Sequence, residues 1–206
     1  MNIFNNIFPQ NELAELINQA GYEFMAGNFK AALERFREAE DFAHKSKLWD
    51  KYGDLILGNI GATLTQLGET EEAISVLEHF RYIPDDQITT DYSVRALGNL
   101  GVAYSNQSRT LDARELYDRC LSLSQKYNWQ EDMAKQYNNL GTLFHEEGHL
   151  EFALRNYFHA LEIIRQINDK RTESECLGNI GHAYQELNLL DDAQNIVYKR
   201  LTLRRK

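Results

Sequence analysis

The chain has 206 residues, of which 43% are hydrophobic and 26% charged, as in a soluble protein that folds around a core. Its formal net charge of −9 would repel nucleic acid from most of the surface. No apolar run approaches the ~20 residues of a membrane span, and the N-terminus lacks the basic and apolar regions of a signal peptide. Because Cys120 and Cys176 form no disulfide pattern, we expect a cytoplasmic protein. The charge and the lack of an apolar span lead us to expect no binding to nucleic acid or membrane.

An apolar segment opens the chain. Ile3 and Phe4 are followed four residues later by Ile7 and Phe8, the spacing of one helical face. We expect residues 1–12 to form an N-terminal docking segment, which packs either on the structure that follows or on a partner.

Internal repetition organises the remainder of the chain. The strings LGNIG, LGNLG, YNNLG and LGNIG begin at residues 57, 97, 137 and 177, a spacing of 40, and a weaker copy, INQAG, begins at Ile17. A fixed period of this length is the signature of a repeat protein. We therefore predict one solenoid domain over residues 13–206, with repeats at about 13–52, 53–92, 93–132, 133–172 and 173–206.

Each copy has the pattern of two helices. In the third copy Leu97, Leu100 and Tyr104 follow the spacing of one helical face. A second apolar stripe follows a break, and since one helix pair cannot bury both stripes, successive pairs are expected to stack. The breaks fall at residues suited to a left-handed turn, namely Gly27-Asn28, Gly68, Ser108, Gly148 and Asn188.

The recurring residues resemble the tetratricopeptide repeat. The resemblance implies an all-α fold, a right-handed α-solenoid of about five helix-turn-helix repeats. The period of 40 residues is longer than the usual ~34 and is similar to a long-helix subtype with an asparagine ladder. The fifth copy departs from the pattern, with Val197 and Arg200 where an aromatic and a small residue are usual. In the fourth copy the matching residues are Tyr137, Leu140-Gly141, Phe144, Ala153, Tyr157 and Ala160.

Amide side chains recur at one position of the first helix of each pair. An amide offers both a hydrogen-bond donor and an acceptor, which suits the backbone of an extended peptide. In tetratricopeptide repeats the first helix lines the concave groove, so the resemblance implies that this ladder contacts a peptide there. The alternative is that these amides, and the glycines that precede most of them, serve helix packing. The ladder consists of Asn59, Asn99, Asn139 and Asn179, with Gln19 in the first copy.

Residues beside the ladder are predicted to tune selectivity. Arg95 and Lys135 lie one turn before the ladder position in the two middle copies, where they could hold a peptide carboxylate. The alternative is that both are solvated surface bases. Asn138, which replaces the glycine in the fourth copy, and His145 and His182, which follow the ladder, complete the predicted peptide-binding set.

One string imitates a metalloenzyme. His145-Glu146-Glu147-Gly148-His149 matches H-E-x-x-H, in which both histidines must project from one helix. Gly148 falls at a predicted turn, so we expect the two histidines to lie on different helices. No other motif indicates a catalytic residue, a metal site or a cofactor.

These observations favour a non-enzymatic protein–protein interaction module, an adaptor, scaffold or peptide receptor that binds an extended peptide or disordered segment. The alternative is a structural subunit or homo-oligomer. It would assemble through the apolar N-terminal segment and through the last repeat, which has no polar helix after Leu201 and Leu203 to cap it.

Overall fold

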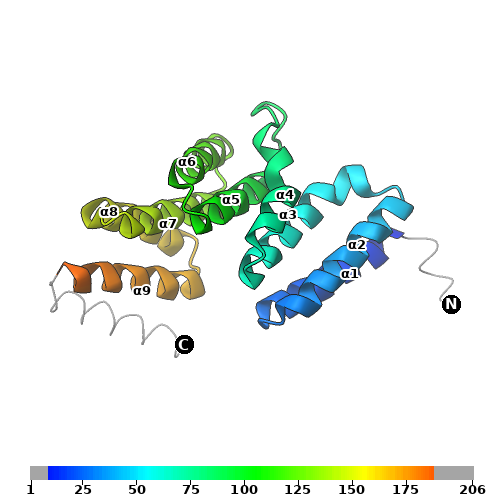
Figure 1. Cartoon of the computed structure of the whole chain (residues 1–206), viewed down its shortest axis with the longest axis horizontal. Helices are drawn as coiled ribbons and strands as arrows, with labels where there is room; N and C mark the ends of the chain where they lie inside the picture. The colour runs from blue at the N-terminus through cyan, green and yellow to red at the C-terminus, as the bar shows by residue number, and fades with distance from the viewer. Residues whose placement is uncertain (1–8, 188–206) are drawn as a thin grey trace. The chain divides into compact units, whose positions relative to one another are not determined.

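The computed structural model describes residues 9–187, and residues 1–8 and 188–206 lie outside the described part. Over this range the chain folds into nine α-helices without a strand (Figure 1), so the predicted all-α fold is confirmed. The helices are α1 (Pro9–Met25), α2 (Phe29–Lys45), α3 (Trp49–Leu67), α4 (Thr70–Arg81), α5 (Asp91–Asn106), α6 (Thr110–Tyr127), α7 (Gln130–Glu146), α8 (Leu150–Gln166) and α9 (Lys170–Glu186).

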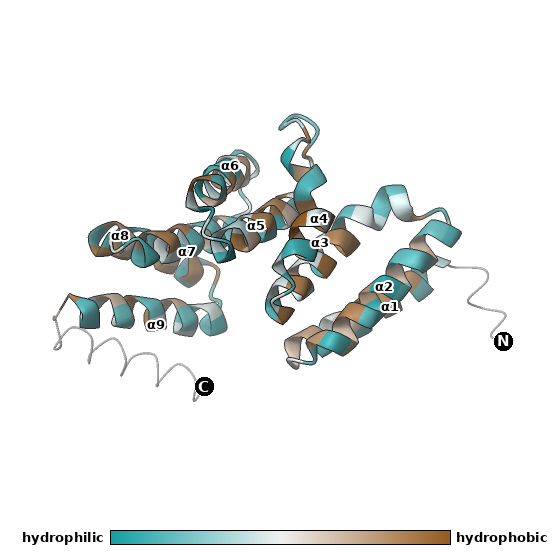
Figure 2. Ribbon diagram, viewed as in Figure 1, coloured by the Kyte–Doolittle hydropathy of each residue, from teal (hydrophilic) through white to brown (hydrophobic). Residues whose placement is uncertain are grey.

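The chain divides between Arg109 and Thr110 into two compact units, the first built from α1 to α5 and the second from α6 to α9. Each described helix carries both hydrophobic and hydrophilic residues (Figure 2). Helices with two such faces bury the apolar one against a neighbour.

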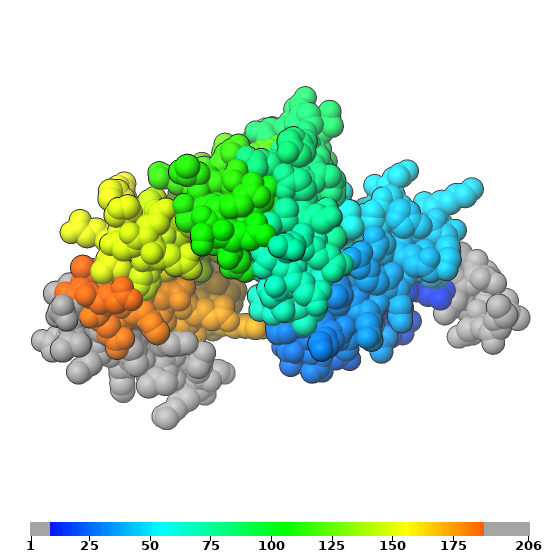
Figure 3. Space-filling view, in the orientation of Figure 1, coloured from blue at the N-terminus to red at the C-terminus, as the bar shows by residue number. Residues whose placement is uncertain are grey.

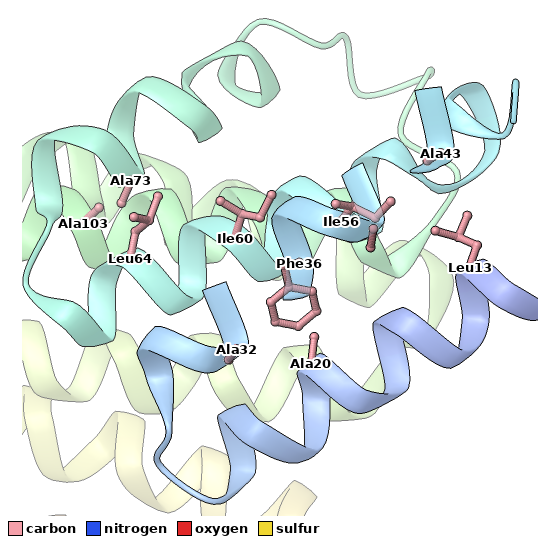
Figure 4. Packing of buried hydrophobic residues seen from close by; sticks show 11 residues of the cluster. Leu13, Ala20, Ala32, Phe36, Ala43, Ile56, Ile60, Leu64, Ala73 and Ala103 are labelled. Atoms are coloured by element: carbon pink, nitrogen blue, oxygen red, sulfur yellow. The ribbon is translucent and has the colours of Figure 1, made fainter. Parts of the chain in front are cut away.

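In the first unit, α3 contacts α5 as well as α4. The first helices of successive pairs therefore touch, as expected where helix pairs stack into a repeat. The core is rich in alanines, such as Ala32 and Ala39, which let helices approach closely. The Phe36 ring of α2 reaches toward Ala20 of α1 in this core (Figure 4).

In the second unit, α7 contacts both α8 and α9. Tyr157, Ile164 and Ile180 are buried in its core. On the visible face the side chains of α8 and α9, yellow and orange, lie against each other (Figure 3). The second unit thus repeats the arrangement of the first, with paired helices and a contact between first helices.

The turns fall where the sequence predicted them. Gly27, Gly68 and Gly148 have positive φ values of 80°, 78° and 76°. Ser108 adopts the same left-handed region, with φ at 59°. A residue with positive φ cannot continue a right-handed helix, so each of these positions separates the two helices of a pair.

The glycine that ends the recurring five-residue string is required by packing within the pair in two of the copies. A Cβ on Gly61 would clash with the Leu77 side chain of α4. A Cβ on Gly141 would meet the Tyr157 ring of α8 in the same way. In these two copies the glycine is therefore explained by the second helix that packs directly on it.

The observed elements differ in detail from the predicted ranges. The first helices begin at residues 9, 49, 91, 130 and 170, a few residues before the predicted starts of the repeats. Of the predicted docking segment, only residues 9–12 are described, and they belong to α1.

The predicted second helix of the fifth repeat, with Val197, Arg200, Leu201 and Leu203, lies outside the described residues. The same holds for Asn188, the last of the predicted turn positions. Among the described helices, none is long and apolar enough to cross a membrane.

Candidate functional site

The amide ladder lies on the first helices, as predicted. Asn59 and Asn99 belong to α3 and α5 of the first unit, and Asn139 and Asn179 to α7 and α9 of the second. All four side chains are partly buried. A residue that is half covered and half accessible can contact both its own fold and a ligand.

In the first unit the ladder contacts the protein's own helices. Asn99 Nδ2 of α5 donates a hydrogen bond to the carbonyl oxygen of Gly58 in α3, at 3.1 Å. Asn59 Nδ2 donates to the Leu55 carbonyl oxygen one turn earlier in its own helix, at 2.9 Å. A Cβ on Gly58 would lie 3.5 Å from the Ala96 Cβ of α5. The backbone that approaches Gly58 is therefore that of α5, at an ordinary contact distance.

Gln19 has partners on both ends of its amide. Its Oε1 accepts a hydrogen bond from Arg35 of α2 at 3.0 Å. Its Nε2 donates to Glu15 at 3.3 Å. The first member of the ladder thus links α1 to α2 as well as lying on the predicted face.

In the second unit the ladder joins two first helices. Asn179 Nδ2 of α9 donates to Asn138 Oδ1 of α7 at 3.1 Å. Asn139 Nδ2 donates to Gln136 Oε1 at 3.4 Å, a long and weak contact. Within the described residues, Asn139 Oδ1 accepts no hydrogen bond, and Nδ2 has a second N–H. Asn139 therefore retains one acceptor and one donor for a ligand.

A cleft of about 380 Å³ opens in the second unit at this position. Its two walls come from α7 and α9, and its floor comes from the C-terminal end of α8. The predicted residues Lys135, Asn138 and Asn139 all line it. The remaining lining residues are Glu131, Ala134, Ile164, Ile167, Asp169, Thr172, Glu175 and Cys176.

The other predicted site residues are not part of the cleft lining. Arg95 forms an ion pair with Asp91 of the same helix, Nη2 to Oδ2 at 2.8 Å. His145 Nε2 lies 3.0 Å from Glu186 Oε1, which connects α7 to α9. His182 is an exposed residue of α9.

Sequence reasoning missed the contribution of the α8–α9 junction. Asp169 caps α9, because its carboxylate accepts hydrogen bonds from the Thr172 backbone N–H at 3.1 Å and hydroxyl at 2.5 Å. These hydrogen bonds lower the pKa of Asp169 below its usual value. The Asp-x-x-Thr spacing before α9 is a capping signal that could have been recognised, but its place in the cleft depends on how α9 packs.

Cys176 lines the cleft without being available for chemistry. It is 1% exposed, and its Sγ donates to the Tyr157 carbonyl oxygen at 3.2 Å. Burial raises the pKa of the thiol to about 12. Since the thiolate is the reactive form, Cys176 serves as an apolar part of the cleft wall.

The H-E-x-x-H string is interrupted as predicted. His145 lies in α7, which ends at Glu146, and His149 precedes α8, which begins at Leu150. Gly148, between the histidines, has a φ of 76°. The two histidines therefore do not project from one helix. Over residues 9–187, no group of three or more His, Cys, Asp or Glu side chains is arranged to hold a metal ion.

Comparisons with known proteins agree with this repeat architecture. Residues 92–163 match the tetratricopeptide repeat family. A stretch of 114 residues, 55% of this chain, is 27% identical to Tonsoku-like protein of Danio rerio, of which it spans 8%.

Two solved structures share the fold. BtubC from P. vanneervenii superposes with a TM-score of 0.73 at 19% identity, over 98% of this chain and 84% of its own. The Rap conjugation gene regulator of plasmid pLS20, in complex with the Phr* peptide, has a TM-score of 0.80 at 14% identity, over 94% of this chain and 53% of that regulator. At these identities the likeness shows the fold, an all-α tetratricopeptide-like solenoid.

Proposed function

We propose that this chain is a non-enzymatic protein-interaction module that binds an extended peptide or disordered segment through its first helices. The observation that carries the proposal is Asn139, whose amide keeps one donor and one acceptor beside a cleft of about 380 Å³. One residue of an extended peptide presents a matching N–H and C=O. Contacts of this kind are independent of the peptide's sequence.

The comparisons support the same function. Tetratricopeptide-like repeats are typically interaction modules, and residues 92–163 match that family. The Rap regulator of similar fold was solved with a peptide bound. We extend peptide binding from that protein to this chain as part of the proposal.

The hydrogen bonds of the predicted amide residues indicate which of them serve packing and which can bind a peptide. Asn138 and Asn179 bond to each other across the first helices, so their main contribution is to hold the cleft walls together. Asn139 is left as the principal peptide-binding amide of the second unit. Asn59, which bonds to the carbonyl oxygen of Leu55, is proposed to add a contact through its remaining polar atoms, whereas Asn99 bonds to the Gly58 carbonyl oxygen and links α5 to α3.

The test is a binding measurement with a matched pair of variants. Short capped peptides would be selected from a random library on the wild-type chain, and their affinities measured by fluorescence anisotropy. Losing two backbone hydrogen bonds through Asn139→Ala should weaken binding ~10-fold. The control is Asn156→Ala, because Asn156 of α8 also donates to a carbonyl oxygen of its own helix, at 2.9 Å, but lies outside the cleft lining.

Equal affinities for the wild type and for a folded Asn139→Ala variant would contradict the role of the cleft. Failure of the wild-type chain to retain any peptide would contradict the proposed function itself. Far-ultraviolet circular dichroism of each variant separates a lost contact from a lost fold.

A further inference from the structure

The charges that line the cleft oppose the sequence-based hypothesis of a carboxylate ligand. Glu131, Asp169 and Glu175 contribute three carboxylates, and Lys135 is the single basic residue of the lining. Glu131 and Lys135 are four residues apart on α7, the spacing at which a glutamate and a lysine offset each other. The other two carboxylates of the lining, Asp169 and Glu175, lie on the α9 side, where the nearby cation is Arg171, which is not a lining residue.

The two acidic residues on that side differ in their environment. Both carboxylate oxygens of Asp169 accept hydrogen bonds from Thr172, which fixes the carboxylate in the charged form at neutral pH. Glu175 lies 3.5 Å from Arg171, with the side chains 58% and 65% exposed. An exposed pair of this kind contributes little energy, so Glu175 can exchange Arg171 for a ligand cation at small cost.

The rest of the lining suits the stem of a long side chain. Half-buried Ile167 forms an apolar floor, and the buried side chains of Ile164 and Ala134 lie behind the cleft surface. Lysine and arginine lay their methylene stems on apolar surface and keep the charged head in a polar setting. An apolar floor below a carboxylate rim is complementary to that shape and charge.

We propose that the cleft between α7 and α9 selects a lysine or arginine side chain of the bound segment, with its stem on Ile167 and its charged head beside Glu175 and Asp169. This inference rests on the proposed function and names the class of segment that the site takes, a basic one. Asn139 would form hydrogen bonds with the backbone of the same residue. One cleft would then contact both the main chain and the side chain of the bound segment.

The experiment compares residue preferences in the same random library of short capped peptides. On the wild-type chain, the retained peptides should be enriched in lysine or arginine at one position. Reversing a charge through Glu175→Lys should weaken binding of those peptides ~10-fold. Binding should also weaken as salt concentration rises, because the attraction between charges is screened.

The matched control is Glu162→Lys, because Glu162 is an exposed residue of α8 outside the cleft lining. It changes the net charge of the chain by the same amount, so it separates a local contact from general attraction between an acidic protein and a basic peptide. We expect its affinity to stay within ~2-fold of the wild type, as for an exposed charge away from the binding site.

The two proposals fail in different ways. One outcome is that peptides are retained and Asn139→Ala weakens their binding, but the peptides are enriched in acidic residues or lack basic ones. In that case the inference about charge is overturned and the proposed function stands. Equal weakening by Glu162→Lys and Glu175→Lys would also overturn the inference. If the wild-type chain retains no peptide, both proposals are overturned together.

Discussion

Asn179 donates a hydrogen bond to Asn138 at 3.1 Å, side chain to side chain, between α9 and α7. Two residues of the predicted peptide-binding set, one in the ladder and one beside it, thus hold successive first helices together. Asn99 makes an equivalent link to the Gly58 carbonyl oxygen. The ladder therefore has a packing role in both units, and a substitution in it tests stability as well as binding.

The link between Asn179 and Asn138 should be measurable as a coupling energy. We expect the single variants Asn179→Ala and Asn138→Ala each to lower the free energy of unfolding by about 1 kcal/mol. The double variant should lose less than the sum of the two, because one hydrogen bond is removed only once. Urea unfolding of the four proteins checks this, and strict additivity would show that the bond contributes nothing.

The two glycines Gly141 and Gly21 should respond oppositely to the same substitution. Gly141→Ala places a Cβ against the Tyr157 ring, and overpacking should destabilise the chain by roughly 1–3 kcal/mol. Gly21→Ala in α1 meets nothing within 4 Å, so the better helix propensity of alanine should stabilise it by roughly 0.5–1 kcal/mol. Thermal unfolding followed by circular dichroism measures both. Similar effects at the two sites would contradict the packing described for Gly141.

Glu173 should make stability depend on pH. Burial alone would raise the pKa of its carboxyl, but Arg165 at 2.8 Å and Lys170 at 3.1 Å hold that pKa below 4.5. A folded-state pKa below the unfolded value stabilises the fold above pH 4.5 and loses that contribution as pH falls through the folded pKa. We expect Glu173→Gln to cost about 1–2 kcal/mol at pH 7.

The pH effect has its own control. In urea unfolding performed below pH 4.5, the free energy of unfolding of the Glu173→Gln variant should be closer to that of the wild type than it is at pH 7. Glu162→Gln, an exposed residue of α8, should stay within about 0.5 kcal/mol of the wild type throughout. A deficit at Glu173 that is the same at both pH values would show that packing, and not charge, is responsible.

The thiols should be unreactive in the folded chain. Cys120 and Cys176 are 0% and 1% exposed, and burial raises the pKa of Cys176 to about 12. A thiol reagent at pH 8 should therefore label neither residue in native protein and both in urea. Mass spectrometry of the intact chain counts the labels. Rapid labelling of Cys176 before unfolding would show that the cleft wall opens.

The sequence was sufficient for the features that depend on local spacing. The helix pairs follow from apolar residues such as Leu97, Leu100 and Tyr104 at one helical face. The turns follow from Gly27, Gly68 and Gly148, since the left-handed backbone is inexpensive only for such residues. The repeat period of 40 residues placed Asn59, Asn99, Asn139 and Asn179 at one position of successive first helices.

Only the tertiary structure decided which of these amides are used within the fold and where the cleft lies. Asn179 meets Asn138 because of how closely α9 approaches α7. Asp169 and Ile167 enter the cleft because α8 ends beside it. The sequence determined the helix pairs and their turns, whose causes lie within a few residues along the chain, and the ladder, which follows from the repeat period. The tertiary structure decided the cleft and its charge, because these depend on packing distances between residues far apart in sequence.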